Sequence, residues 1–295
     1  MQSLSDGTLL DAIRGLHWPA RRATRGAAHG SHRSHRIGSS PEFMQYREYR
    51  PGDDASKIDW KLYGRTERVN VRQTRDDSEL RTTILVDASA SMAYPLPGLD
   101  KWTMASAIAI GLAAVAIGDR DPVGLAVVGG TGVEVLPPRS ATNTVANIQR
   151  VLGGVVPSGS RPLAPVLAML RTSRRVAIIS DFLGDADALL ERAAELVAAG
   201  REVFAVHIVA REELEPRTLG SLVVDPEEEA IRRPLDEDGL EEYRSAFARW
   251  REELASSWRA KGIVYHLAIT DEPADQVIRR IVTPAATAAV TGEPS

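Results

Sequence analysis

Cysteine is absent from this 295-residue chain, and long uncharged apolar runs are scarce. The lack of cysteine excludes disulfide bonds, thiolate zinc sites and thiol catalysis, and it suits a reducing compartment. The first residues include an early Asp6 and no apolar run of the length that a secretory signal needs. Residues 102–118 form an uncharged stretch, but this stretch is rich in Ala and Gly and is flanked by charges, so a buried helix is expected rather than a membrane span. We therefore expect a soluble, cytoplasmic protein.

Neither sign of charge dominates, since the chain has 36 Lys and Arg residues and 40 Asp and Glu residues, which gives a net charge of −4. This balance argues against a uniformly basic nucleic-acid-binding protein. The segment between Asp11 and Glu42 nevertheless holds six arginines, four histidines and no acid. This arm is either a solvated loop or a segment that binds a partner or nucleic acid. His29, His32 and His35 lie three residues apart, but the Gly and Ser residues between them oppose the helix that would align them as metal ligands.

Two patterns divide the chain. Residues 42–75 mix aromatic and charged side chains around a strong turn at 51–54, which predicts a small antiparallel sheet. From residue 82 onward, short runs rich in Val and Ile alternate with longer amphipathic segments. The predicted strands are 82–87, 123–128, 176–180, 203–209 and 263–269, and the predicted helices are 101–118, 142–152, 162–172, 186–199, 240–261 and 273–282.

This alternation predicts an α/β fold with three layers, in which a doubly wound and mostly parallel sheet lies between helices. The expected organisation is a basic arm and small β-rich subdomain over residues 1–79, the α/β domain over 80–283 and a disordered tail over 284–295.

Ligands of such sheets bind at the carboxyl ends of the strands. The first predicted strand ends in the string Asp87-x-Ser89-x-Ser91, whose three oxygen donors suit a hard cation such as Mg²⁺, Mn²⁺ or Ca²⁺. The predicted strand 176–180 is followed by Asp181, which would bring a second carboxylate to the same edge.

A further hydroxyl comes from the loop before the helix at 162, from Ser160 or else from Ser158. The alternative to a metal site is a purely structural role, in which Asp87 and Asp181 cap helices and the serines form hydrogen bonds only within their loops.

These residues resemble the metal-ion-dependent adhesion site of the von Willebrand factor A-type fold. The resemblance implies that Asp87, Ser89, Ser91, Ser160 and Asp181 hold the ion, with an open position for a carboxylate of a partner. Ser160 departs from the Thr that is usual in that family but keeps the hydroxyl.

A second resemblance covers nearly the whole chain. The run from Gly30 to Arg65 (GSHRSHRIGSSPEFMQYREYRPGDDASKIDWKLYGR) is similar to the signature of a bacterial family of unknown function, numbered fifty-eight among such domains, in which it precedes a von Willebrand A-like domain. The matching positions are His32, Ser34, Gly38, Glu42, Phe43, Arg47, Tyr49, Pro51, Gly52, Asp53, Asp54, Ile58, Asp59, Trp60, Lys61 and Arg65.

The resemblance implies a non-enzymatic protein-interaction module that assists a MoxR-type AAA+ ATPase and an unknown client in a chaperone-like system. Many relatives carry membrane helices before the signature, and this chain lacks them, so anchoring is not implied. The charged residues of the signature either lock the small sheet to the larger domain or form a docking face for the ATPase; they are Arg47, Arg50, Asp53, Asp54, Asp59, Lys61 and Arg65.

Two other functions stay open. A metal-dependent phosphatase or other hydrolase would also place an acid at the tip of the first strand, but the second carboxylate of its D-x-D motif is Ser89 here. The chain has neither the G-x-S-x-G motif of a serine hydrolase nor a Walker A motif. The other alternative is nucleic-acid binding through the arm rich in Arg and His.

Overall fold

The computed structural model describes two units of the chain, which are treated separately below. By contacts, the larger unit comprises residues 1–22 and 80–295, and the smaller comprises residues 23–79. The described residues are 7–21, 43–49, 58–74, 80–95, 100–130, 132–216, 222–224, 232–234 and 237–283. Residues 1–22 thus group with the larger unit and not with the arm, whereas the other predicted domain boundaries stay a prediction.

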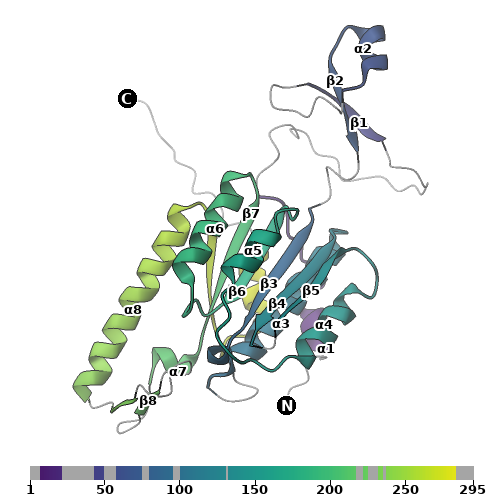
Figure 1. Cartoon of the computed structure of the whole chain (residues 1–295). Helices are drawn as coiled ribbons and strands as arrows, with labels where there is room; N and C mark the ends of the chain where they lie inside the picture. Colours follow the sequence, from purple (N-terminus) through teal and green to yellow (C-terminus); the bar gives the residue numbers. More distant parts are fainter. Residues whose placement is uncertain are drawn as a thin grey trace, which may run out of the picture. The chain divides into compact units, whose positions relative to one another are not determined.

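A six-stranded sheet forms the centre of the larger unit (Figure 1). Its strand order is β10-β7-β6-β3-β4-β5, and all pairs are parallel except β4 with β5. The strands are β3 (Thr82–Ala88), β4 (Val123–Gly129), β5 (Gly132–Arg139), β6 (Arg175–Ser180), β7 (Glu202–Val209) and β10 (Val264–Ile269). The inner strands are buried on both faces, which explains why their sequences are continuous apolar runs.

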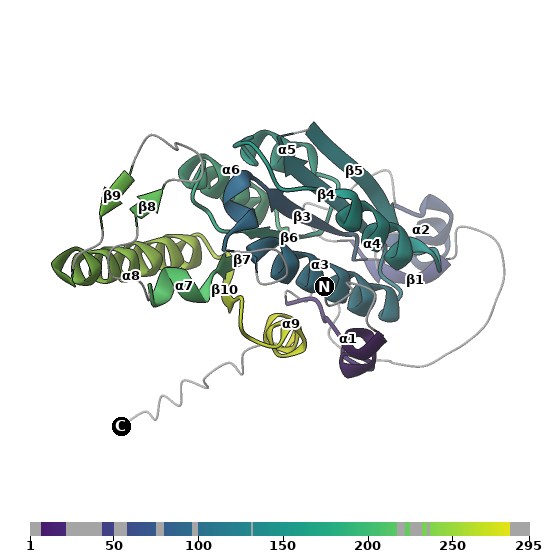
Figure 2. The same cartoon turned by 90° about the horizontal axis from the view of Figure 1, so that it is seen from below.

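Helices cover both faces of the sheet (Figure 2). One layer holds α1 (Gly7–Ala12), α3 (Lys101–Gly118), α4 (Thr144–Gly154) and α9 (Ala274–Val282). The other holds α5 (Ala164–Met169), α6 (Ala186–Ala198) and α8 (Glu237–Ala260). Helix α3 is long and apolar enough to cross a membrane, yet 72% of it is buried against the sheet and its neighbouring helices. The predictions of a three-layer α/β fold and of a buried helix at 101–118 are therefore confirmed.

Strand β5 was not expected from the sequence. It contains Pro137 and Pro138, which lack the N–H that an inner strand needs. The strand lies at the edge of the sheet, and its pairing with β4 shifts register beside Val123, so the prolines are tolerated there.

The remaining short elements of this unit are a 3-10 turn η3 (Ala90–Ala93), helix α7 (Arg211–Leu214) and a hairpin of β8 (Leu222–Val224) with β9 (Arg232–Pro234).

The smaller unit contains β1 (Phe43–Glu48), α2 (Trp60–Thr66) and β2 (Asn70–Thr74), and β1 pairs with β2 in antiparallel fashion. The predicted small antiparallel sheet is therefore confirmed. The prediction of a small sheet over residues 42–75 is wrong for the segment KIDWKLYGR (57–65), because most of this segment forms α2. The Asp59 carboxylate accepts the backbone N–H groups of Lys61 and Leu62, each at 3.0 Å, and this cap starts the helix.

Candidate functional site

The carboxyl ends of β3 and β6 are neighbours, because the two strands pair in parallel with Val86 beside Ile179. Asp87 is the second-last residue of β3, and Asp181 follows β6 directly. Both residues are buried, with 6% and 2% of their surface exposed. The sequence prediction that two acids meet at one edge of the sheet agrees with this placement.

The carboxylate of Asp87 is held by neutral donors. Its Oδ1 accepts the backbone N–H of Ser89 at 2.8 Å, and its Oδ2 accepts the hydroxyl of Ser180 at 2.6 Å. Among the described residues, no Lys or Arg forms an ion pair with it. Burial and, after it, the nearby negative charge of Asp181 together raise the pKa of Asp87 to about 6, against the opposing effect of these hydrogen bonds.

Ser180 was missed in the sequence, although it is the last residue of the apolar run that precedes Asp181. Its hydroxyl donates to Asp87 and accepts the backbone N–H of Phe182 at 2.9 Å. A hydroxyl at the end of the strand next to Asp87 was the available signal.

The hydroxyls of Ser89 and Ser91 lie side by side, with their Oγ atoms 3.1 Å apart, where the chain leaves β3 and enters η3. Both residues are buried. Two adjacent ligands of an octahedral Mg²⁺ ion are about 2.9 Å apart, since each lies ~2.0–2.1 Å from the metal. The spacing of this hydroxyl pair therefore fits two adjacent positions around one small cation.

The loop before α5 is held against the end of β3 by backbone bonds. The N–H of Ser158 donates to the carbonyl of Ala88 at 2.9 Å, and the N–H of Ala90 donates to the carbonyl of Gly159 at 2.8 Å. Gly159 has a φ of +66°, and a Cβ there would lie 2.8 Å from Gly130 Cα, so this close approach requires glycine.

Of the two candidate hydroxyls in this loop, that of Ser158 interacts with its own loop, at 3.4 Å from the carbonyl of Val156. Ser160 instead lines a cavity together with Asp87 and Ser89.

This cavity has a volume of about 340 Å³, and its wall also includes Arg161 and Asp185. Arg161 donates from Nε to the carbonyl of Gly129 at 3.2 Å. Asp185 precedes α6, but its carboxylate accepts the N–H groups of Leu163 at 3.3 Å and Ala164 at 3.0 Å. It therefore caps the start of α5 as well as bordering the cavity.

Asp181 faces a different partner from the one expected. Its Oδ2 accepts the ammonium of Lys101 at 2.7 Å, and its Oδ1 accepts the N–H of Leu183 at 3.2 Å. The same ammonium donates to Glu213 of α7 at 2.8 Å. The side chains of Lys101 and Asp181 are 1% and 3% exposed. Burial lowers the pKa of Lys101, but the two carboxylates more than offset this effect and leave it raised.

The oxygen donors at the site are one carboxylate and several hydroxyls. Within the described part of the chain, no group of three or more His, Cys, Asp or Glu side chains could hold a metal ion, so a cage of carboxylates is absent there. Asp87, Ser89 and Ser91 supply one unpaired carboxylate and two adjacent hydroxyls, and Ser160 lines the same cavity. These oxygens fit a hard divalent ion, whereas the carboxylate of Asp181 is already bonded to Lys101.

The charged signature residues are only partly described. Arg50, Asp53 and Asp54 lie outside the described residues, as do His29, His32 and His35 of the arm. The other four belong to the smaller unit: Arg47 lies on β1, Asp59 caps α2, and Lys61 and Arg65 lie exposed on α2.

Comparisons with known proteins found a matching family and several relatives. A family described as "Protein of unknown function DUF58" matches residues 45–255. Two curated relatives are the uncharacterized proteins Mb1516 of Mycobacterium bovis and Rv1480 of Mycobacterium tuberculosis. Each is 28% identical over 268 residues, which cover 88% of this chain and 84% of the relative.

Solved structures resemble the chain in fold alone. BatB from Bacteroides thetaiotaomicron is 18% identical, with a TM-score of 0.46 over 68% of this chain and 96% of that one. The SpRpn10 VWA domain is 12% identical, with a TM-score of 0.39 over 67% of this chain and 92% of that one. The larger unit has the mostly parallel sheet between two helical layers that the sequence predicts.

Proposed function

The chain belongs to the family of unknown function DUF58, and on this premise we propose that it is a non-enzymatic protein-interaction module of the cytoplasm that captures a partner with the help of a divalent cation. Asp87, Ser89 and Ser91 would hold Mg²⁺, or Mn²⁺ or Ca²⁺, with Ser160 at the rim of the cavity. When bound, the ion supplies a positive charge that can attract a carboxylate of the partner.

The observation that carries this proposal is the state of Asp87. A carboxylate that is buried, bonded only to neutral donors and beside a second acid is unfavourable unless a positive charge joins it. The two hydroxyls 3.1 Å apart and the adjoining cavity supply the other ligands and a path of access for that charge. If Asp87 only capped a helix and the serines bonded only within their loops, neither the buried carboxylate nor the adjacent hydroxyl pair would be needed.

The chain's own residues then have separate tasks. Asp87 supplies the negative charge, and Ser89 and Ser91 supply neutral oxygens. The loop at 158–160 brings Ser160 to the cavity through its backbone bonds to β3. Lys101 pairs with Asp181 and with Glu213, so of the two acids at the ends of β3 and β6 only Asp87 lacks a cationic partner among the described residues. Such a site binds a divalent cation weakly by itself and gains affinity when a partner adds a carboxylate.

For the partner, we propose a MoxR-type AAA+ ATPase that works with this chain on a client protein in a chaperone-like system. Support comes from the resemblance of the signature at 30–65 and from membership of the family. Catalysis by a phosphatase mechanism is disfavoured, because Ser89 occupies the position of the second acid in D-x-D.

The proposal is tested by capture of the purified ATPase on immobilised full-length chain. We expect capture in Mg²⁺ that is lost in EDTA and lost in Asp87→Ala, with the fold intact by circular dichroism. Asp187→Ala removes an exposed acid of α6 and serves as the matched control. Equal capture by wild type and Asp87→Ala, with and without EDTA, would overturn the metal-assisted mechanism.

A further inference from the structure

Helix α2 of the smaller unit exposes two aromatic side chains. Trp60 is 64% exposed and Tyr63 is 41% exposed. Their rings contact each other edge to face, with centroids 6.2 Å apart and planes at 83°. Tryptophan and tyrosine, with arginine, are the residues most enriched at the energetic centres of protein interfaces.

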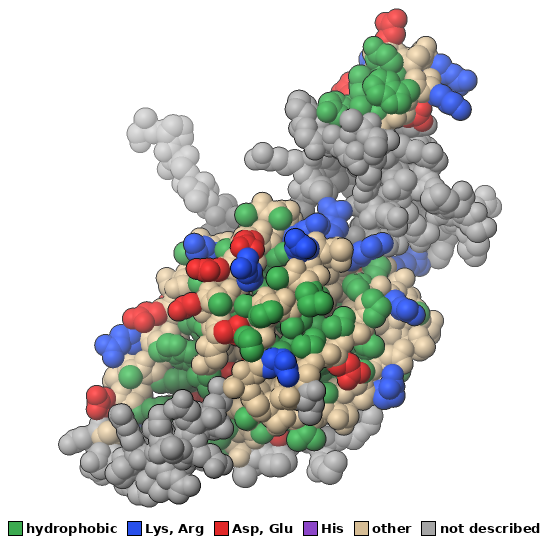
Figure 3. Space-filling model, in the orientation of Figure 1, with side chains coloured by type: hydrophobic (Ala, Val, Ile, Leu, Met, Phe, Trp, Pro, Cys, Tyr) green, Lys and Arg blue, Asp and Glu red, His purple; other side chains and the backbone are tan. Residues whose placement is uncertain are grey.

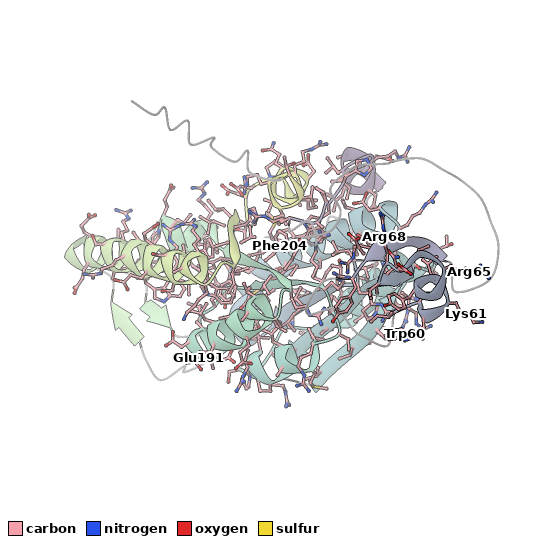
Figure 4. All side chains as sticks on the ribbon, turned by 90° about the horizontal axis from the view of Figure 1, so that it is seen from above. Trp60, Lys61, Arg65, Arg68, Glu191 and Phe204 are labelled. Atoms are coloured by element: carbon pink, nitrogen blue, oxygen red, sulfur yellow. The ribbon has the colours of Figure 1, made fainter. Side chains whose placement is uncertain are left out.

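Basic side chains lie beside this aromatic pair. Lys61 and Arg65 are one helical turn apart on α2, and Arg68 follows the helix. All three are exposed, and none forms an ion pair with another described residue. Figure 4 labels Trp60, Lys61, Arg65 and Arg68 on this unit, and Figure 3 shows hydrophobic and basic side chains next to one another on its surface.

Gly64 separates the two stripes. At 100° per residue, position 64 falls between the aromatic stripe of Trp60 and Tyr63 and the basic stripe of Lys61 and Arg65. A Cβ at Gly64 would meet no atom within 4 Å, so the middle of this surface is open. We call the surface formed by Trp60, Lys61, Tyr63, Gly64, Arg65 and Arg68 the α2 patch.

We propose that the α2 patch is a second docking surface, which binds an acidic protein surface that also offers an apolar recess for the indole of Trp60. This inference rests on the proposed function, since the occupant is the same ATPase partner that the metal-assisted site captures. The three cations, which form no ion pair with another described residue, favour carboxylates on the facing surface, and the projecting indole favours a recess. The patch adds Trp60, Tyr63 and Arg68 to the charged residues expected from the signature.

The arrangement of the rings favours a protein over a nucleic acid. Bases stack on aromatic rings that present open, successive faces along a groove. Here the two rings stand nearly perpendicular to each other, and Glu67 adds an exposed negative charge beside the cations. Tryptophan, tyrosine and arginine, all of which the patch contains, are the residues most enriched at protein-binding hot spots.

The sharpest test uses Gly64, because the site can be blocked without removing any contact of the fold. Gly64→Glu places a carboxylate in the middle of the patch, and Gly64→Ala is the matched control. Both changes should preserve α2, since either residue favours a helix more than glycine does. Trp60→Ala removes the anchor directly, and Met169→Ala removes a side chain that is 73% exposed on the larger unit as its control.

The dissociation constant of the purified MoxR-type ATPase from the same organism would be measured against each full-length variant in Mg²⁺. We expect Trp60→Ala to weaken binding about 10- to 100-fold, and Gly64→Glu by at least about tenfold. Gly64→Ala and Met169→Ala should stay within about twofold of wild type. Circular dichroism of every variant excludes unfolding as the cause.

Each outcome decides between the two proposals. If Trp60→Ala and Gly64→Glu bind as wild type does while Asp87→Ala does not, the α2 patch is refuted and the metal-assisted site stands. The reverse pattern supports the patch and refutes the metal-assisted site. If the wild type fails to bind the ATPase, both fall. Retention of a single-stranded oligonucleotide that Trp60→Ala abolishes, or self-association lost in that variant, would overturn the choice of an acidic protein partner.

Discussion

Replacing Asp87 with asparagine should make the metal-free protein more stable at neutral pH. The structure holds this carboxylate buried, bonded to neutral donors and close to Asp181. Asparagine keeps the shape, accepts the N–H of Ser89 through its carbonyl oxygen and donates its amide N–H to the hydroxyl of Ser180. The substitution therefore removes an unfavourable charge and keeps both hydrogen bonds.

The size of the effect follows from the pKa of Asp87, which rises from 3.8 to about 6 on folding. The folded state binds the proton of Asp87 more tightly than the unfolded state does, so ionisation penalises folding as the pH rises from about 4 to about 6. A difference of roughly two units corresponds to about 3 kcal/mol, at 1.36 kcal/mol per unit. Wild type should lose this amount relative to Asp87→Asn by pH 7.5.

Urea denaturation in EDTA between pH 4 and pH 8 measures this difference, because groups far from Asp87 titrate alike in both proteins and cancel. We expect the two free energies of unfolding to be nearly equal at pH 4 and to diverge through pH 5–6. Saturating Mg²⁺ should then stabilise wild type, by about 2.7 kcal/mol at a hundred times the dissociation constant, and leave Asp87→Asn unchanged. A less stable Asp87→Asn at pH 7.5, or a difference that does not vary with pH, would refute this reasoning.

Three further changes probe the surroundings of the site. Asp181→Asn should destabilise the fold by about 1.5–3 kcal/mol in the same urea assay, the opposite sign from Asp87→Asn, since it removes a charge-assisted hydrogen bond of Lys101, whose ammonium stays paired with Glu213. A stabilised variant would contradict this assignment. Gly159→Ala should cost about 2 kcal/mol and weaken Mn²⁺ binding, because its positive φ and the Cα of Gly130 leave no room for a methyl group, and unchanged affinity would separate the loop from the site. Arg175→Met should speed the hydrogen exchange of the backbone amides over residues 16–21. The guanidinium carbon of Arg175 lies 4.2 Å from the ring centroid of Trp18, and Arg175 donates to the carbonyl of Pro19 at 2.9 Å. Unaltered exchange would show that other contacts hold this segment.

The sequence is most informative about the central sheet and the helices that cover it. Runs of Val and Ile identify strands that are buried on both faces, and the β3–β6 neighbourhood that brings Asp87 near Asp181 follows from the usual topology of such sheets. Strand β5 was missed because Pro137 and Pro138 read as a loop, and only its edge position tolerates them. Helix α2 was missed because its alternating aromatic and charged residues resemble the pattern of a strand. The Asp59 carboxylate caps the first backbone N–H groups of this segment and thereby favours a helix.

The candidate site was predictable in its residues and less so in its contacts. Asp87, Ser89 and Ser91 follow one strand, so their proximity is local and could be read from the string D-x-S-x-S. The pairing of Asp181 with Lys101 joins residues 80 positions apart and depends on how α3 packs across the sheet. Neither hydrophobic periodicity nor residue spacing predicts such a contact. From the sequence alone, Lys101 in the first turn of a helix is expected to be exposed to solvent.

The cation site at Asp87 can be measured by Mn²⁺ titration of the full-length chain, followed by the relaxation of water protons. We expect one weak site in wild type that competes with Mg²⁺, weakens in Ser89→Ala and Ser91→Ala and disappears in Asp87→Asn. Mn²⁺ binding should persist in Asp181→Asn under conditions where that variant stays folded. Absence of binding in wild type, or equal binding in Asp87→Asn, would show that Asp87 holds no cation.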